Sequence, residues 1–222
     1  MRYGYRMTTH AAVPGDTPEP GDTTEADGPR PRAAVVVVST LIARGEEGDR
    51  SGPLLVDWLR GSGYECPAPR VAEDGGPVGA VLRELLGLSA HDRPGAHLDG
   101  GHAGTGLDGG SPAAASAAVA RADRQVPDLI VTSGGTGLNP ADRTPEETDA
   151  LLEVRAPGIM HALWAKGLTS TPSAVMSRGV AGARGATFLV NLPGSTGGVR
   201  DGIAVLTPLL PHIRHQLGDC DG

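Results

Sequence analysis

The sequence contains few lysines, aromatic residues and cysteines. Lys166 is its only lysine, and aromatic residues make up 3% of the 222 residues. With so few aromatic side chains, a hydrophobic core must be built from valine, leucine, isoleucine and alanine. The two cysteines, Cys66 and Cys220, lie far apart and share no C-x-x-C spacing, which argues against a zinc site and against a disulfide framework.

The acidic balance and the short apolar runs restrict the possible partners. The formal net charge is −7, and no basic patch is available to neutralise the phosphates of a nucleic acid. The longest apolar run, 33–42, is too short to span a bilayer, and the N-terminus has no basic segment followed by an apolar one. We therefore expect a cytoplasmic protein with neither a nucleic-acid nor a membrane partner.

Two segments have compositions that oppose folding. Residues 1–32 are rich in threonine, proline, glycine and acidic residues, which predicts a disordered N-terminal tail because little apolar surface can offset the entropy of ordering. Residues 89–118 contain mainly glycine, alanine, serine and histidine without periodicity, which predicts a low-complexity insert. The sequence thus predicts one domain over 33–222 that carries this insert.

Strand-like and helical patterns alternate through the predicted domain. The run 33–38 contains only alanine and valine, as expected for a strand buried on both faces of a parallel sheet. Further strands are predicted at 65–71, 128–132 and 187–191. Apolar residues at helical spacing predict helices at 53–62, 77–88, 119–125, 145–168 with a break near Pro157, and 199–217. This alternation indicates an α/β domain with a mostly parallel sheet, in which ligands bind beyond the carboxyl ends of the strands.

A glycine-rich loop follows the strand predicted at 128–132 and is the most informative stretch of the chain. Its glycines let backbone approach a ligand closely, and their N–H groups can point at an anion. The loop consists of Ser133, Gly134, Gly135, Thr136 and Gly137. Asp142 then supplies the oxygen ligands that Mg²⁺ prefers. Residues 144–147 match a capping box and predict a helix start. The alternative is a tight strand-to-helix turn without a ligand.

Other loops offer further candidate residues, each with a purely structural alternative. Pro193, Gly194 and Ser195 follow the last predicted strand, where a ligand-facing loop and a plain turn are equally compatible with the sequence. Ser177 and Arg178 place a hydroxyl and a guanidinium in the same cleft, or lie on the surface.

The remaining candidates lie nearer the N-terminus. Asp49 and Ser51 precede a predicted helix and would serve equally as its cap. Asp74 is a single acid after the second predicted strand. None of the seven histidines lies in these strand-end loops, so general-base chemistry by histidine is not expected.

The candidate residues instead offer carboxylates, a metal site and backbone N–H groups. This combination favours phosphoryl or nucleotidyl transfer, in which positioning and charge stabilisation dominate.

Five segments together resemble the MogA/MoaB family of molybdenum cofactor biosynthesis. They are 49–53, 132–137, 142–146, 171–179 and 192–195, and the resemblance covers 33–88 and 119–217. It implies a three-layer α/β/α sandwich that assembles as a homotrimer or homohexamer. It also implies ATP- and Mg²⁺-dependent adenylylation of molybdopterin, in which the terminal phosphate attacks the α-phosphorus and pyrophosphate leaves. The adenylyl-molybdopterin product would pass to the molybdate-insertion protein.

The resemblance also assigns roles to residues. Asp142 would be the required acid and the metal ligand, and Asp74 would be a second catalytic acid. The substrates would be bound by Asp49, Ser51, the loop from Ser133 to Gly137 and, on the pterin side, Ser177, Arg178, Pro193, Gly194 and Ser195.

The sequence departs from the family pattern after the first strand. That strand usually ends in Ser-Asp, whereas here it ends in Ser39 and Thr40. The Pro-Gly-x-Pro turn is replaced by 193–196, and the insert at 89–118 is additional. Because one acid is missing, a non-catalytic molybdopterin-binding or scaffold protein is the alternative function.

Overall fold

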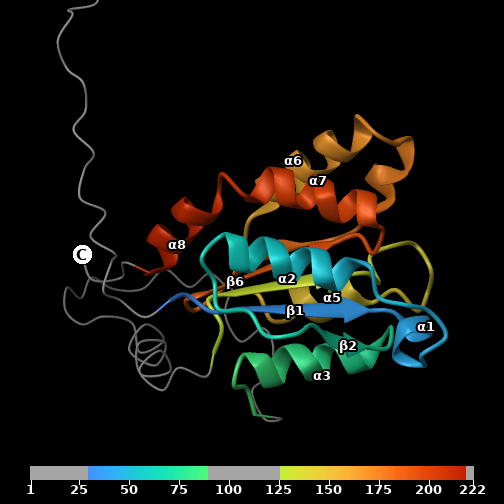
Figure 1. Ribbon diagram of the computed structural model, residues 1–222, viewed down its shortest axis with the longest axis horizontal. Helices are drawn as coiled ribbons and strands as arrows, with labels where there is room; N and C mark the ends of the chain where they lie inside the picture. The colour runs from blue at the N-terminus through green and yellow to red at the C-terminus, as the bar shows by residue number, and fades with distance from the viewer. Residues whose placement is uncertain (1–29, 90–125, 219–222) are drawn as a thin grey trace, which may run out of the picture.

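The computed structural model describes residues 30–89 and 126–218, in which six strands form one sheet (Figure 1). The strand order is β2-β1-β3-β6-β5-β4. The first four strands in this order are parallel, whereas β5 pairs antiparallel with both β6 and β4. The strands are β1 (Ala33–Val38), β2 (Arg70–Ala72), β3 (Leu129–Ser133), β4 (Val154–Arg155), β5 (Ala181–Arg184) and β6 (Thr187–Leu192).

Three of the sequence predictions fall on other parts of the chain. The tail at 1–32 and the insert at 89–118 lie almost entirely outside the described residues, and the helix at 119–125 lies wholly outside them. Within the described residues, none of the helices is both long and apolar enough to cross a membrane.

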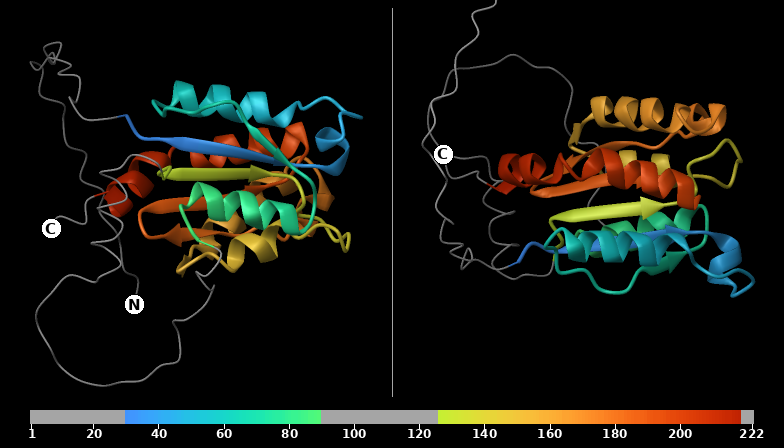
Figure 2. Two further views of the ribbon diagram at one scale, coloured as in Figure 1. Left: turned by 90° about the horizontal axis from the view of Figure 1, so that it is seen from below. Right: turned by 45° about the horizontal axis from the view of Figure 1, so that its top comes forward.

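Helices cover both faces of the sheet and create three layers. They are α1 (Thr40–Ala43), α2 (Ser51–Gly61), α3 (Gly76–Leu85), α5 (Thr144–Asp149), α6 (Pro157–Leu168), the 3₁₀ helix η1 (Pro172–Met176), α7 (Thr196–Leu206) and α8 (Leu210–Gly218). Val35 and Val37 pack with α2, α6, α7 and α8, whereas Val36 and Val38 pack with α3, because successive strand residues point to opposite faces. Figures 1 and 2 show α2 and α3 on opposite sides of β1. The predicted α/β sandwich is therefore confirmed.

The helix predicted at 145–168 is wrong as a single element. The segment contains α5, the edge strand β4 and α6, and Pro157 begins α6 instead of interrupting a helix. Both residues of β4 are exposed, so that strand has no apolar signature in the sequence. The prediction also lacks β5, whose alanines and glycine have low strand propensity. Gly182 suits this strand because a Cβ there would overlap the carbonyl oxygen of Val154.

Other boundaries also differ from the sequence prediction. β2 begins only at Arg70, since Pro67 and Pro69 cannot donate to a strand ladder. The helix predicted at 199–217 is divided into α7 and α8, with Pro208 between them.

The predicted capping box at 144–147 does not form. The N-cap of α5 is Arg143, whose side chain makes no capping hydrogen bond, and Thr144 already belongs to the helix. Its hydroxyl is buried and has no hydrogen-bond partner among the described residues.

A buried hydrogen-bond network holds α5 to the sheet. The Asn191 side chain donates to the hydroxyls of Thr132 in β3 and Thr148 in α5, each at 2.9 Å. Its Oδ1 accepts a hydrogen bond from the Val180 N–H at 3.0 Å. The amide thus joins four segments directly behind the loops that follow β3 and β6.

We predict that Asn191→Leu lowers the free energy of unfolding by at least about 2 kcal/mol, because it leaves buried polar groups unpaired. Urea unfolding followed by circular dichroism measures this change. Gln216→Leu, at an exposed position in α8, is the control and should stay within about 0.5 kcal/mol of the parent protein. Equal effects of the two substitutions would contradict the assigned role of the network.

Candidate active site

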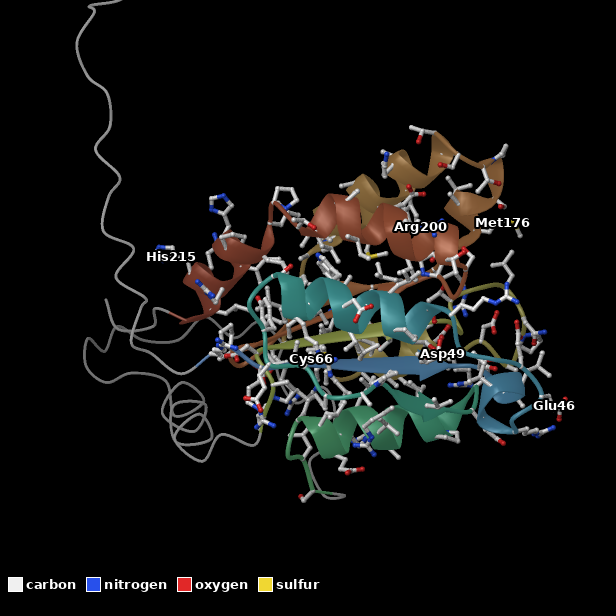
Figure 3. The ribbon with its side chains drawn as sticks, viewed as in Figure 1. Glu46, Asp49, Cys66, Met176, Arg200 and His215 are labelled. Atoms are coloured by element: carbon white, nitrogen blue, oxygen red, sulfur yellow. The ribbon has the colours of Figure 1, made fainter. Side chains whose placement is uncertain are left out.

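A polar cleft of 540 Å³ opens at the carboxyl ends of β1, β3 and β6. This is the edge at which parallel sheets bind ligands. Nine of the residues singled out in the sequence line it, namely Ser51, Ser133, Gly134, Gly135, Thr136, Gly137, Asp142, Gly194 and Ser195. Figure 3 shows Asp49 and Met176 toward this end of the molecule and His215 toward the other.

The glycine loop has a backbone shape that other residues would strain. Gly134 and Gly135 have positive φ angles of 107° and 62°. A Cβ at Gly134 would overlap the carbonyl oxygen of Val38, and one at Gly135 would overlap the hydroxyl of Thr144. The loop therefore packs directly against the end of β1 and the start of α5.

The β6–α7 turn lies against this loop. Ser133 Oγ donates to the carbonyl of Pro193 at 3.2 Å, and the Gly134 N–H donates to the carbonyl of Leu192 at 3.0 Å. Gly194 approaches so closely that its Cβ would lie 3.2 Å from the Gly134 Cα. Ser195 caps α7, since its Oγ accepts a hydrogen bond from the Gly198 N–H at 3.1 Å. The two loops thus form one wall of the cleft.

The two candidate acids have different environments. Asp142 is half-buried, and a Cβ at Gly137 would lie 2.6 Å from its Oδ2. Among the described residues its carboxylate makes no hydrogen bond or ion pair, so it is available to a ligand. Asp74 instead accepts hydrogen bonds from the backbone N–H and the hydroxyl of Thr40, both at 3.0 Å. Thr40, the residue that departs from the family pattern, therefore fixes the orientation of Asp74.

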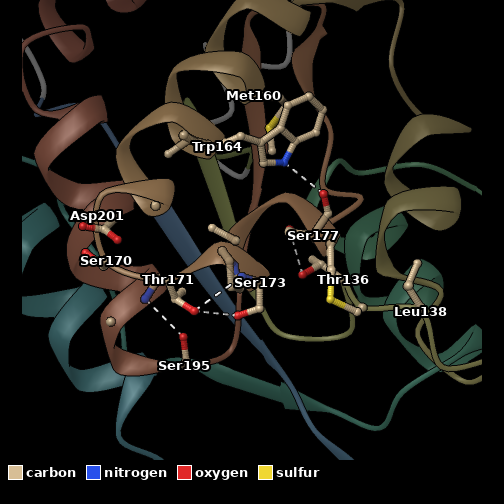
Figure 4. Close-up of a pocket in the computed structure, with 18 residues that line it drawn as sticks. Thr136, Leu138, Met160, Trp164, Ser170, Thr171, Ser173, Ser177, Ser195 and Asp201 are labelled. Carbon is tan, nitrogen blue, oxygen red and sulfur yellow. Dashed lines mark hydrogen bonds between the residues drawn. The ribbon is translucent and has the colours of Figure 1, made fainter.

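A second, largely apolar cavity of 340 Å³ adjoins the polar cleft (Figure 4). It lies between α6, η1 and α7, and shares Thr136, Gly137 and Ser195 with the cleft. Its α6 wall is formed by Met160, Leu163, Trp164 and Gly167, none of which was predicted from the sequence as a site residue. Their i, i+3, i+4, i+7 spacing is a detectable signal, but it equally describes a helix that packs on a core.

Comparisons with known proteins agree on one family. Residues 105–212 match the family model described as "Probable molybdopterin binding domain". The structure of the Mog protein from Mycobacterium ulcerans is 36% identical, with a TM-score of 0.65 over 85% of this chain and 99% of that chain. The chain belongs to the MogA/MoaB family.

Two curated relatives of this chain have names that state a function. The molybdenum cofactor biosynthesis bifunctional protein of Synechococcus elongatus is 32% identical over 81% of this chain and 45% of its own length. The molybdopterin adenylyltransferase of Helicobacter pylori is 35% identical over 38% of this chain and 48% of its own length. The chain thus spans less than half the length of these relatives.

Arg178 holds the MogA/MoaB glycine loop in place. Its Nε donates to the carbonyl of Gly137 at 2.7 Å, and its two terminal nitrogens donate to the carbonyl of Asp142 and the carboxylate of Glu146. Ser177 Oγ hydrogen-bonds to Thr136 Oγ1 at 3.1 Å. Both residues therefore contact the loop, and the guanidinium is already engaged by protein acceptors.

Asp49 also makes its contacts with protein groups. Its Oδ1 accepts hydrogen bonds from the N–H groups of Ser51 and Gly52, each at 2.9 Å, at the start of α2. Ser51 is buried, and its Oγ lies 3.2 Å from the same carboxylate oxygen. Asp49 therefore accepts hydrogen bonds from the first turn of α2, although the N-cap residue is Arg50. Ser51 is already part of the helix, contacts Asp49 and lines the cleft.

We predict that Gly134→Ala lowers the free energy of unfolding by about 1–3 kcal/mol, because alanine strains this φ angle and meets the Val38 carbonyl. Thermal and urea unfolding measure the change. The control is Gly61→Ala in α2, where no atom lies within 4 Å of the added Cβ, and it should be neutral or slightly stabilising. A neutral result at Gly134 would contradict the close approach of the loop to β1.

The ion pair of Arg178 with Glu146 should make stability depend on pH. The hydrogen bond from Arg178 holds the pKa of Glu146 below its usual value. The pair therefore stabilises the fold above the unfolded-state pKa, and this contribution is lost as the pH falls through the lowered pKa. We predict that Glu146→Gln is destabilising at neutral pH and that the difference from the parent disappears in acid. Urea unfolding across this pH range tests the prediction, and Glu65→Gln, at an exposed site, is the control for the loss of a surface carboxylate.

Proposed function

We propose that this protein adenylylates molybdopterin in molybdenum cofactor biosynthesis, using ATP and Mg²⁺, in the cytoplasm where ATP is available. The observation that carries the proposal is the carboxylate of Asp142, which has no partner in the described part of the chain and lies beside a glycine loop. The loop and the carboxylate line a polar cleft that opens into an apolar cavity. Family membership and the name of the Helicobacter pylori relative support the same reaction. A triphosphate and a flat heterocycle require this combination of polar and apolar surfaces.

The glycine loop provides the donors for phosphate. The N–H groups of Gly135, Thr136 and Gly137 make no hydrogen bond within the described part of the chain, and all three residues line the cleft. Successive N–H groups of this kind form a concave site for an anion. They would stabilise the charge that develops on the α-phosphate of the transferred adenylyl group, which is the main catalytic contribution a protein makes to such a transfer.

The residues also fit a magnesium ion that is carried by the nucleotide. The described residues contain no group of three acids, histidines or cysteines able to enclose a metal alone. Mg²⁺ on a nucleotide needs only one or two carboxylates besides the phosphates, and Asp142 supplies one. When bound, the ion would neutralise phosphate charge, while Asp74 is positioned by Thr40 at the same edge of the sheet.

The proposed reaction balances without a base from the protein. An oxygen of the terminal phosphate of molybdopterin forms a bond to the α-phosphorus of ATP. The bond between that phosphorus and the oxygen leading to the β-phosphate breaks, and pyrophosphate leaves with the electron pair. Because the attacking phosphate is already ionised at neutral pH, no histidine is needed, and none lines the cleft among the described residues.

The alternative is a molybdopterin-binding or scaffold protein without catalysis. Thr40 in place of an acid favours this alternative, because one carboxylate is absent from the site. The two hydrogen bonds from Thr40 to Asp74 favour a catalytic function, because they hold a candidate catalytic acid in one orientation. Anaerobic incubation with molybdopterin, ATP and Mg²⁺ separates the two. Pyrophosphate release supports the enzyme, and tight binding without release supports the alternative.

We also propose assembly as a homotrimer or homohexamer and transfer of the product to the molybdate-insertion protein. Four large apolar side chains are exposed at the end of α6, in η1 and after the glycine loop, and they support a subunit contact there. They are Leu138, Leu168, Val175 and Met176. Light scattering of the purified protein measures the mass of the assembly, and a monomer at micromolar concentration would contradict the proposal.

We predict that Asp142→Asn lowers turnover by about 10²-fold or more while leaving the fold intact, since the substitution removes charge from the site without changing its size. Pyrophosphate release measures turnover, and circular dichroism checks the fold. Asp57→Asn, at an exposed position of α2, removes the same charge elsewhere and should leave turnover unchanged. Near-normal turnover of the Asp142 variant would remove this residue from its proposed role.

A further inference from the structure

The apolar cavity contains one carboxylate. Asp201, in the middle of α7, lines this cavity and is partly buried. Its side chain makes no hydrogen bond or ion pair within the described residues. Figure 4 shows it on the side of the cavity that α7 forms. Because a partly buried carboxylate loses hydration without gaining a partner, its presence there points to a ligand that supplies donors.

The surroundings of Asp201 suit a flat ring. Met160, Leu163 and Trp164 supply apolar surface from α6. Gly197 also lines the cavity, and no atom lies within 4 Å of the place where its Cβ would be, so this wall is open. The volume of 340 Å³ lies at the lower end of the range for small-molecule sites. The shared residues Thr136 and Ser195 connect the ring site to the polar cleft.

We propose that Asp201 determines specificity by binding a 2-amino-4-oxopyrimidine edge, the edge common to pterin and guanine, in this cavity. Such an edge carries an amino group beside a ring N–H, and these two donors match the two oxygens of a carboxylate. Two parallel charge-assisted hydrogen bonds are strong and geometrically selective. Only the choice of pterin as the natural source rests on the proposed function.

The same carboxylate selects against adenine. Adenine has one amino group beside a ring nitrogen that is an acceptor, and the lone pair of that nitrogen would face an oxygen of Asp201. A site built for two donors rejects a ring that lacks one of them, because its buried acceptor is left unpaired. The adenine of ATP would therefore bind outside this cavity, with its phosphates in the polar cleft.

Binding of simple heterocycles to the full chain tests the inference without any turnover. The probes are 6-hydroxymethylpterin, guanosine and adenosine, measured by calorimetry. We expect the parent protein to bind the pterin and to bind adenosine more weakly at this site. Asp201→Asn should weaken pterin binding by about 10- to 100-fold, the scale of one lost bidentate contact, and leave adenosine unchanged. Asp201→Glu keeps the carboxylate and should retain part of the affinity.

A control variant and the order of affinities distinguish a pterin from a guanine as the ligand of Asp201. Asp57→Asn removes an equal charge from an exposed site and should leave pterin binding unchanged. Tighter binding of the pterin than of guanosine supports a pterin ligand, and the reverse order supports a guanine ligand for the same carboxylate. Unchanged pterin affinity in Asp201→Asn, equal weakening for adenosine, or no pterin binding by the parent would each overturn the inference.

The adenylylation assay separates this inference from the proposed function. If the parent binds the pterin through Asp201 but releases no pyrophosphate, the proposed function fails and the specificity role stands. If the parent adenylylates molybdopterin and Asp201→Asn leaves the KM for molybdopterin unchanged, the specificity role fails and the proposed function stands.

Discussion

The close approach of the glycine loop to the end of β1 determines the shape of the site. Gly134 passes the Val38 carbonyl at a distance that leaves no room for a Cβ, and Gly135 does the same at Thr144. This approach places the loop N–H groups that have no partner in the described structure at the carboxyl edge of the sheet. It also lets the β6–α7 turn lie against the loop, where Ser133 and Gly134 bond to its carbonyls. The polar cleft exists because these two turns meet.

Side chains from distant parts of the chain keep the loop in this shape. Arg178 connects the segment after η1 to the carbonyls of Gly137 and Asp142, and Asn191 ties α5 to β3 and β6 behind them. Both are polar residues whose hydrogen-bonding groups are used within the protein, so they preorganise backbone groups instead of presenting their own. Asp142 then faces the cleft without a partner among the described residues, and a ligand meets a site that needs little rearrangement.

The sequence predicted features with local causes and missed those that depend on tertiary contacts. The strand at 33–38 and the loop after 128–132 were predictable because continuous valines and clustered glycines act over a few residues. The edge strand β4 was not, since Val154 and Arg155 are exposed and are held by pairing with β5, which follows later in the chain. The hydrogen-bond partners of Arg178 lie 32 to 41 residues away in the sequence, so its contacts with the glycine loop could not be predicted from adjacent residues. The apolar cavity has the same origin, because α6, η1 and α7 form it only after they pack.

The hydroxyls of two threonines near Asp74 differ in whether they have a hydrogen-bond partner. Thr40 uses its N–H and hydroxyl on one carboxylate oxygen, whereas the hydroxyl of Thr144 is buried with no partner in the described structure. The other oxygen of Asp74 and the Thr144 hydroxyl both lie close to the position that a Cβ of Gly135 would occupy. A buried unpaired hydroxyl costs about 1–3 kcal/mol, which a purely structural helix start could avoid with valine. Destabilising features of this kind are typical of functional sites. Here the unpaired hydroxyl lies beside Gly135 and Asp74, at the cleft proposed to bind the substrates.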